Sequence, residues 1–290
     1  MEQRQANGSQ GMIRLEPAAF GSVAALPLWA GLEIHLAVAS VLAGTTPGRV
    51  YVDDSGAPAN ALLQTGGRFY LAGSPAVEAW RRGLRSFFLD LTSHQGSGSG
   101  GFGLFYGDAG WKAALDEVLA GTDHLPAQRV YLELAVEGAA PPPPLPPGMR
   151  LRSVDRDLLA EERLGRLEEL LDEMASECPS AEFFVDHRFG VALEAEGRLA
   201  GWCLSEFNVG DRCEVGIETA PEHRRRGLGT ALALALACQA RELGIGHIGW
   251  HASQANQAST ATALRAGFRH MGSYPAHVLL YGRHDSRTKT

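Results

Sequence analysis

The segment 214–230 constrains the fold more than any other part of the chain. Residues 214–219 alternate in side-chain type, a period of two that predicts a strand with two different faces. Pro221 has no N–H to donate and ends that strand. Three consecutive arginines then lead into Gly227 and Gly229, and a long run of Ala and Leu, the strongest helix formers, follows. The sequence therefore predicts a strand, a tight turn and a helix.

This turn has the composition of an anion-binding site. The first N–H groups of a helix have no partner within the helix, and the helix dipole places partial positive charge at the same end. Gly227 and Gly229 let the backbone approach a ligand closely. We therefore expect the start of this helix to bind an anion, phosphate above all.

The overall composition limits the class of protein. The chain has 290 residues, of which 45% are hydrophobic and 20% charged, as expected for a globular protein with two domains. Its net charge of −7 argues against a nucleic-acid partner. The cysteines have no CxxC spacing, which argues against a metal site or a disulfide framework and favours reduced thiols; they are Cys178, Cys203, Cys213 and Cys238.

The longest apolar run covers residues 23–43. Pro27, Glu33 and His35 interrupt it where charge and a helix breaker are costly in a membrane, so we expect a buried helix over Leu26 to Ala43 and no membrane partner. The first residues lack the pattern of a signal peptide, and the expected location is the cytoplasm.

The proline-rich segment 141–147, with six prolines in seven residues, is the expected linker between two domains, residues 1–140 and 148–290. Each half reads as helix, three strands, helix, strand, helix and strand, which indicates a duplicated domain. At the end of the second half, Arg269 to Tyr281 is expected to form two closing strands around Pro275. The predicted fold class is α/β (α+β), with two tandem domains that each have a mixed, mostly antiparallel sheet flanked by helices.

The two predicted copies differ at the turn after the third strand. In the first half this turn is Ala72–Gly73–Ser74–Pro75 and has no arginine, so only the second half carries the anion site. A G-x-G-x-x-G match at Gly98, Gly100 and Gly103 is followed by a strand rather than a helix, and we read it as a loop without nucleotide chemistry.

Three motifs in order point to a known family. Arg224-x-x-Gly227-x-Gly229 resembles the coenzyme A pyrophosphate loop of the GNAT N-acetyltransferase superfamily, and Asn256-x-x-Ser259 and Gly267–Phe268 follow at the offsets that this superfamily uses. The longer pattern is similar to a bacterial two-domain group in which a degenerate GNAT-like first half precedes a coenzyme A-binding GNAT domain.

The resemblance implies a sheet splayed between its fourth and fifth strands, at Arg212 to Ala220 and His247 to Ala252, with acetyl-CoA as co-substrate and no metal. It implies that backbone groups around Ile217, Glu218 and Thr219 bind pantetheine, and that N–H groups of residues 225–230 hold the diphosphate. The expected cofactor-binding residues are Ile217, Thr219, Arg224, Arg225, Arg226, Gly227, Leu228, Gly229, Thr230, Asn256 and Ser259.

Two carboxylates are candidates for the catalytic base. Glu214 and Glu218 fall on one face of the strand that lines the gap, and either is placed to accept the proton of an attacking amine, directly or through water. We favour Glu218 because it lies nearer the expected thioester. The competing reading is that both are simply solvated or paired with a neighbouring arginine.

The chain departs from the superfamily at the general acid. The tyrosine that often protonates the leaving thiolate is expected seven residues after Asn256, where this chain has Ala263. Substitutes for it are Tyr274, Tyr281, Ser259 or a water molecule. Trp250 and His251 on the fifth strand either touch the acceptor or pack in the core.

The leading functional hypothesis is transfer of an acetyl group from acetyl-CoA to a primary amine by direct attack in a ternary complex. The alternative is a non-catalytic coenzyme A-binding or regulatory module. The negative charge favours a small cationic acceptor such as a polyamine, an aminoglycoside or an amino sugar, and a protein acceptor is a third hypothesis. We expect a monomer or a homodimer.

Overall fold

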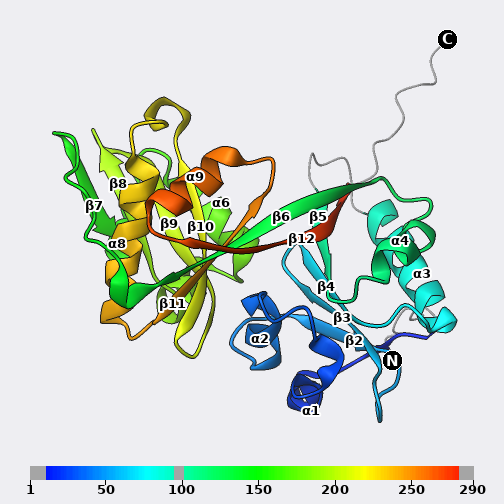
Figure 1. Ribbon diagram of the computed structural model, residues 1–290. Helices are drawn as coiled ribbons and strands as arrows, with labels where there is room; N and C mark the ends of the chain where they lie inside the picture. Colours follow the sequence, from blue (N-terminus) through cyan, green and yellow to red (C-terminus); the bar gives the residue numbers. More distant parts are fainter. Residues whose placement is uncertain (1–10, 95–100, 281–290) are drawn as a thin grey trace. The chain divides into compact units, whose positions relative to one another are not determined.

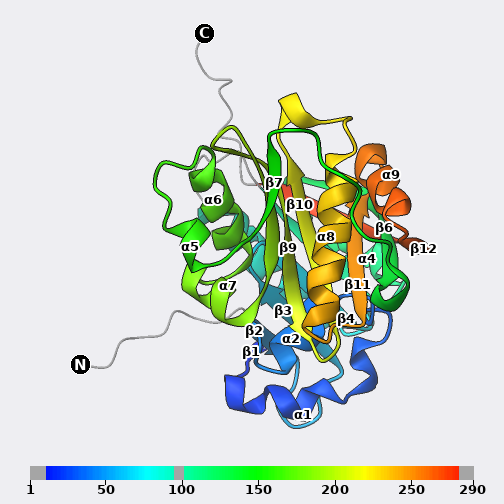
Figure 2. The ribbon, with the colours of Figure 1, turned by 90° about the vertical axis from the view of Figure 1, so that its left-hand side faces the viewer.

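The computed structural model describes residues 11–94 and 101–280 (Figures 1 and 2). These residues form two compact units. The first comprises residues 11–44, 48–94, 101–127 and 275–280, and the second comprises residues 45–47 and 128–274.

The first unit is a sheet with the strand order β1-β2-β3-β4-β5-β12. Its elements are β1 (Ile13–Arg14), η1 (Pro17–Ala19), α1 (Phe20–Ala24), η2 (Pro27–Trp29), α2 (Leu36–Leu42), β2 (Arg49–Val52), β3 (Asn60–Thr65), β4 (Arg68–Gly73), α3 (Glu78–His94), β5 (Gly101–Tyr106) and α4 (Trp111–Val118). The expected meander of three strands is confirmed by the antiparallel pairs β2–β3 and β3–β4. Aromatic residues of α3 and α4, among them Trp80, Phe88 and Trp111, form its fully buried core with the sheet.

The second unit is a sheet with the order β6-β11-β10-β9-β8-β7. Its elements are β6 (His124–Ala135), η3 (Val136–Gly138), β7 (Met149–Ser153), α5 (Arg156–Leu159), α6 (Leu167–Glu177), α7 (Ala181–His187), β8 (Gly190–Ala195), β9 (Arg198–Val209), β10 (Arg212–Thr219), η4 (Pro221–His223), α8 (Leu228–Glu242), β11 (His247–Ser253), α9 (Gln257–Arg265) and β12 (Arg269–Leu280).

The two faces of the second sheet are covered by different helices. Helix α8 lies along the face that Figure 2 shows, and its Ala and Leu residues pack there with alternate residues of β8, β10 and β11. Helices α5, α6 and α7 pack with Leu204 and Trp202 of β9, whose side chains point to the opposite face. The strand period of two thus separates the two cores.

The expected duplication is confirmed, with one difference in the last strands. Read from β1 and from β7, both sheets contain four antiparallel strands and then a parallel pair, β4–β5 in one and β10–β11 in the other. The closing strands are exchanged: residues 276–280 of β12 pair with β5, and residues 129–135 of β6 pair with β11.

The proline-rich segment 141–147 lies within the second unit, so the observed division differs from the expected linker. The segment joins β6 at one edge of the second sheet to β7 at the other. The two edge strands are five strand spacings of about 4.8 Å apart, so the connection must cover about 24 Å. Seven residues in the extended polyproline conformation supply about 22 Å, and Leu145, the one residue among them that is not proline, packs on the core.

Two expected elements are corrected. Leu26 to Ala43 is not one helix, because Gly31 adopts a left-handed backbone (φ 82°) and separates η2 from α2. Residues 269–281 were expected to form two strands around Pro275, but β12 is a single strand up to Leu280 (red in Figure 1). Gly98, Gly100 and Tyr281 lie outside the described residues. Within residues 11–94 and 101–280, no helix has the length and apolar character needed to cross a membrane.

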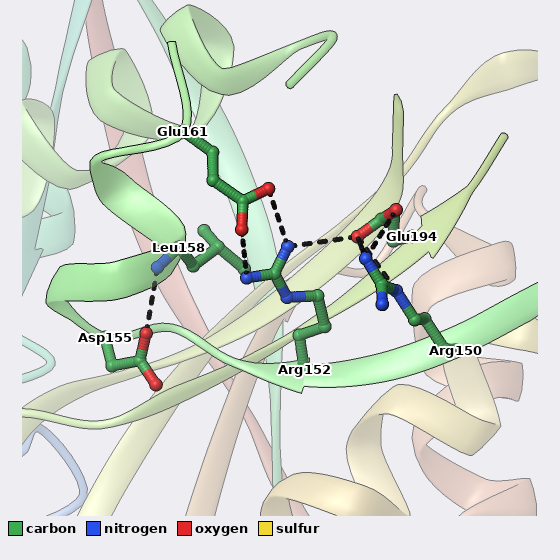
Figure 3. A network of polar contacts seen from close by, with 6 residues as sticks. All are labelled: Arg150, Arg152, Asp155, Leu158, Glu161 and Glu194. Carbon is green, nitrogen blue, oxygen red and sulfur yellow. Dashed lines mark hydrogen bonds and ion pairs between the residues drawn. The ribbon is translucent and has the colours of Figure 1, made fainter. Parts of the chain in front are cut away.

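An ion-pair network holds the edge strand β7 to its neighbours (Figure 3). The nearly buried carboxylate of Glu194 on β8 accepts hydrogen bonds from Arg150 and Arg152 of β7. Arg152 also pairs with Glu161 at 2.6 Å, just after α5. The network is confined to this edge of the sheet and makes a structural contribution.

Candidate active site

Strands β10 and β11 separate along their length. Their parallel ladder joins three residue pairs, from Arg212–His247 to Glu214–Gly249, and residues 215–219 of β10 have no partner on β11. On its other side β10 stays paired with β9 as far as Thr219, and β11 stays paired with β6 as far as Ser253. The splay expected between these two strands is therefore confirmed.

The corresponding strands of the first unit do not separate in this way. The ladder of β4 and β5 runs from Arg68–Gly103 to Leu71–Tyr106, and the N–H of Gly107 continues it by donating to the Leu71 carbonyl. The Trp111 indole donates to the Gly73 carbonyl at 2.9 Å, at the end of β4. Among the described residues, only β10 of the second unit separates from the parallel strand next to it.

The turn between β10 and α8 bends sharply at two residues. After the 3-10 turn η4, Arg225 and Gly227 both have left-handed backbones, with φ of 60° and 79°. Gly227 is the N-cap of α8 and has no side-chain capping bond. Glycine avoids the strain that a side chain adds in this conformation. The expected tight glycine-containing turn is confirmed.

The backbone N–H groups of this turn are available to a ligand. The first helical bond of α8 runs from the Ala231 N–H to the Gly227 carbonyl at 3.1 Å. Within the described parts of the chain, no backbone or side-chain acceptor bonds the N–H groups of residues 225–230. These donors, at the positive end of a 15-residue helix, form an anion-binding arrangement.

The three arginine side chains differ in position. Arg224 turns back onto β10: its Nε donates to the Thr219 carbonyl at 2.9 Å, and its guanidinium pairs with Glu218 at 3.1 Å. Arg226 contacts His223, and Arg225 is exposed. Arg224 therefore fixes the turn to the strand end.

Helix α9 begins beside the turn. The Asn256 side chain caps α9 by accepting from the Ser259 N–H at 3.1 Å, and the Ser259 hydroxyl accepts from the Trp250 indole at 3.0 Å. A Cβ on Gly229 would lie 3.1 Å from the Thr262 side chain, so Gly229 allows α8 and α9 to approach. Ala263, which lies seven residues after Asn256, is completely buried.

The two candidate carboxylates lie in different surroundings. Glu218 is partly exposed, at 37% of its side chain, and pairs with Arg224. The Glu214 side chain is 6% exposed, and its carboxylate lies 3.4 Å from Nε2 of His251. Glu214 sits at the last position of β10 that pairs with β11, where the two strands begin to separate.

A family model that covers most of the chain gives its family. The family model described as GNAT acetyltransferase matches residues 27–277. The chain belongs to the GNAT acetyltransferase family. An uncharacterized N-acetyltransferase, YdfB of Bacillus subtilis, is 26% identical over 241 residues, which cover 82% of this chain and 87% of YdfB. A streptothricin acetyltransferase of Streptomyces lavendulae is 35% identical over 89 residues, 30% of this chain and 47% of that protein.

Solved structures share the fold of this GNAT protein. A GCN5-related N-acetyltransferase-like protein from Streptococcus suis superposes with a TM-score of 0.65 at 20% identity, over 91% of this chain and all of that one. A tandem GNAT protein from the clavulanic acid biosynthesis pathway superposes with a TM-score of 0.59 at 16% identity, over 94% of this chain and 99% of that one. The expected tandem GNAT fold is confirmed.

Beyond the family motifs, the GNAT domain contains polar groups that sequence reasoning did not connect. His251 and Tyr274 are bonded to each other, and Arg129 and Tyr131 of β6 complete the cluster. Arg129 and Tyr131 were not among the candidates. Their alternation along one strand is a detectable signal, but the expected domain boundary puts this strand in the first half, and the sequence does not show that it pairs with β11.

The buried thiols of this GNAT domain are unsuited to nucleophilic chemistry. Burial raises the pKa of Cys178, Cys203 and Cys213 above the usual thiol value, so these groups stay protonated at neutral pH. Among the described residues, no group of three or more His, Cys, Asp or Glu side chains is arranged to hold a metal ion.

Proposed function

We propose that this GNAT acetyltransferase moves an acetyl group from acetyl-CoA to a primary amine by direct attack in a ternary complex. The observation that carries this proposal is the splay of β10 and β11 beside the unpaired N–H groups of residues 225–230. The opening offers a place for the thioester, and the turn offers one for the diphosphate.

The cofactor contacts in this proposal are made mainly by the backbone. Residues 217–219 have no partner on β11, so their backbone groups are candidates to bond pantetheine. The N–H groups of residues 225–230 hold the diphosphate, each bond to a charged oxygen contributing roughly 1.5–3 kcal/mol. Asn256 and Ser259 act indirectly, since their printed bonds set the start of α9.

The amine must lose a proton before or during its attack on the thioester. Both Glu214 and Glu218 are candidates to drive this loss. The contacts favour Glu214, because Glu218 is paired with Arg224 while Glu214 contacts a histidine that can carry protons. This is the reverse of the sequence-based preference for Glu218, which depended on its expected distance to the thioester.

The acceptor class in this proposal is a small cationic amine. Glu206 and Glu214 face each other across β9 and β10, and both are buried, which makes this part of the sheet acidic. The partial similarity to a streptothricin acetyltransferase is compatible with such an acceptor. A protein amine is the alternative, and we propose a monomer or homodimer that works in the cytoplasm, with its four cysteines reduced.

The test incubates the purified chain with acetyl-CoA and a panel of polyamines, aminoglycosides, amino sugars and a lysine-containing peptide, and measures release of free thiol. We expect Glu214→Gln to lower kcat by roughly 100-fold, and the matched Glu218→Gln to lower it only a few-fold. Tight binding of coenzyme A without thiol release for any amine would favour the non-catalytic module instead.

A further inference from the structure

Two hydrogen bonds and one ion-pair contact join four polar side chains of the second unit in a continuous chain. Arg129 Nε donates to the Tyr274 hydroxyl at 3.2 Å, this hydroxyl lies 2.7 Å from Nδ1 of His251, and Nε2 of His251 lies 3.4 Å from the Glu214 carboxylate. The residues come from β6, β12, β11 and β10. The fold thus brings together groups separated by up to 145 positions.

The direction of these bonds follows from their chemistry. Arginine only donates, so the Tyr274 oxygen accepts from Arg129. The Glu214 carboxylate only accepts, so Nε2 of His251 carries a proton. A neutral imidazole has a single N–H, and its Nδ1 is therefore the acceptor for the Tyr274 hydroxyl. Every donor in the chain points from Arg129 towards Glu214.

The charges at the two ends favour proton movement along this chain. If the Tyr274 proton passes to His251, the phenolate remains beside the Arg129 cation and the imidazolium beside the Glu214 anion. Each new charge has an opposite charge next to it, which lowers the cost of forming both. The two tyrosine rings also hold the imidazole: Tyr131 stacks on it at 4.8 Å, and Tyr274 meets it edge-on at 5.6 Å.

The chain of bonds lies at the opening between the strands. Glu214 and Gly249 form the last pair of β10 and β11, and His251 is two residues further along β11, on the same face as Glu214 and Gly249. A Cβ on Gly249 would lie 3.3 Å from the Glu214 side chain, so glycine there lets this side chain lie over β11. This chain of contacts, the proton relay, therefore begins at Glu214, where β10 and β11 are still paired, and continues to His251, where they have separated.

We propose that Tyr274 is the catalytic acid and base of this transferase and that His251, with Glu214 and Arg129, positions and charges it. Glu214 then promotes loss of the amine proton through His251 and Tyr274, and does not accept this proton itself. This inference rests on the proposed function. A hydroxyl oxygen accepts two hydrogen bonds, so Tyr274 can hold Arg129 and the amine together. It accepts the amine proton as its own proton moves to His251 Nδ1, while the N–C bond forms and the C–S bond breaks.

The same path returns the proton. His251 gives it back through Tyr274 to the thiolate, so that amine and acetyl-CoA become amide and coenzyme A, and the four side chains end as they began. This assignment accounts for Ala263. That alanine is completely buried in the core cluster that also contains Trp250 and Phe268, and it carries no acid, so a tyrosine on β12 takes the role.

The activity test compares Tyr274→Phe, His251→Gln and the double variant with the wild type, using the fastest amine of the panel. Each single variant is expected to lower kcat roughly 100-fold with an unchanged Kd for coenzyme A. The double variant is expected to be no slower than either single one, because the two residues act as a unit. Tyr51→Phe, at a tyrosine of β2 in the first unit that lies outside this cluster, is the matched control and should leave kcat unchanged.

Two measurements need no acceptor. Slow hydrolysis of acetyl-CoA alone uses water in place of the amine and should fall in the same variants. Nitrogen-15 NMR of the histidines, with His251 assigned by its loss in His251→Gln, should show the Nε2–H tautomer at neutral pH and a shift of Nδ1 in Tyr274→Phe.

The outcomes separate the two proposals. If transfer occurs but Tyr274→Phe stays within about threefold of the wild type, or if the single effects multiply in the double variant, the relay is refuted while the transferase stands. An Nδ1–H tautomer of His251 also refutes it. If the wild type binds coenzyme A but neither transfers nor hydrolyses the acetyl group, both proposals fall.

Discussion

Thr230 offers a substitution that should affect folding and cofactor binding in opposite directions. Gly227 is the N-cap of α8, so Thr230 is the third residue of the helix and one of the residues whose N–H has no partner. An aspartate there is attracted to the positive end of the helix and repels a diphosphate at the same end. We therefore expect Thr230→Asp to stabilise the free protein and to weaken its binding of coenzyme A.

The size of each effect can be estimated. An acidic residue in the first helical turn contributes about 0.3–1 kcal/mol of stability. The loop 224–227 is exposed, so the dielectric is closer to water than to a protein core. Two unit charges about 6 Å apart then repel by about 0.7–1.4 kcal/mol, and two phosphate charges by about twice that. The Kd for coenzyme A should rise roughly 10- to 100-fold.

The assay is calorimetric titration with coenzyme A together with thermal unfolding, and Thr230→Asn is the neutral control of nearly the same shape. The difference in Kd between the Asp and Asn variants should shrink as salt is raised, because exposed charges are screened. Equal affinity of the two variants at low salt would show that the diphosphate does not lie at the start of α8. A lower melting temperature for the Asp variant than for the Asn variant would refute the assignment of free N–H groups there.

Three further results are expected. Gly249→Ala places a Cβ 3.1 Å from the Tyr131 ring, so unfolding by denaturant should show a loss of about 1–3 kcal/mol; unchanged stability would contradict this packing. Ala263→Tyr should not restore a general acid, because the site is fully buried, and should cost about 1–3 kcal/mol or more; a folded variant with faster turnover would argue against the relay. A hydrogen bond from Arg152 lowers the pKa of Glu161. The contribution of this ion pair to folding stability is therefore present above the ordinary glutamate pKa and disappears as the pH falls through the lowered pKa. The difference in melting temperature between wild type and Glu161→Gln should therefore shrink from about pH 6 to about pH 3, and a constant difference would exclude this ion pair as its source.

Much of the turn between β10 and α8 was predictable because its structure depends on neighbouring residues. Alternation over residues 214–219, the break at Pro221 and the glycines at 227 and 229 act locally through backbone preferences and side-chain period. The structure agrees with each of these. The helix expected over Leu26 to Ala43 is interrupted for an equally local reason: Gly31 adopts a left-handed backbone, which the spacing of apolar residues does not reveal.

The environment of each carboxylate was less predictable. The spacing of Glu214 and Glu218 puts both on one face of β10, and that much followed from the period of a strand. Their difference depends on what lies opposite: Arg224 folds back from the turn onto one, and His251 approaches the other from β11. The register between strands far apart in the sequence depends on their pairing and packing, and a local sequence pattern does not predict it.

The amino-acid sequence by itself determined that this protein has a duplicated α/β plan, a turn with three arginines and two glycines in one copy only, and the motifs of a GNAT acetyltransferase. Only the tertiary structure decided that the last strands of the two halves are exchanged, that the proline-rich segment 141–147 spans the second sheet, and that Tyr274 meets His251. The physical reason is the sequence separation of the interacting residues. Turns and strand faces are fixed by residues a few positions apart, whereas a hydrogen-bonded cluster drawn from four strands exists only after those strands have paired.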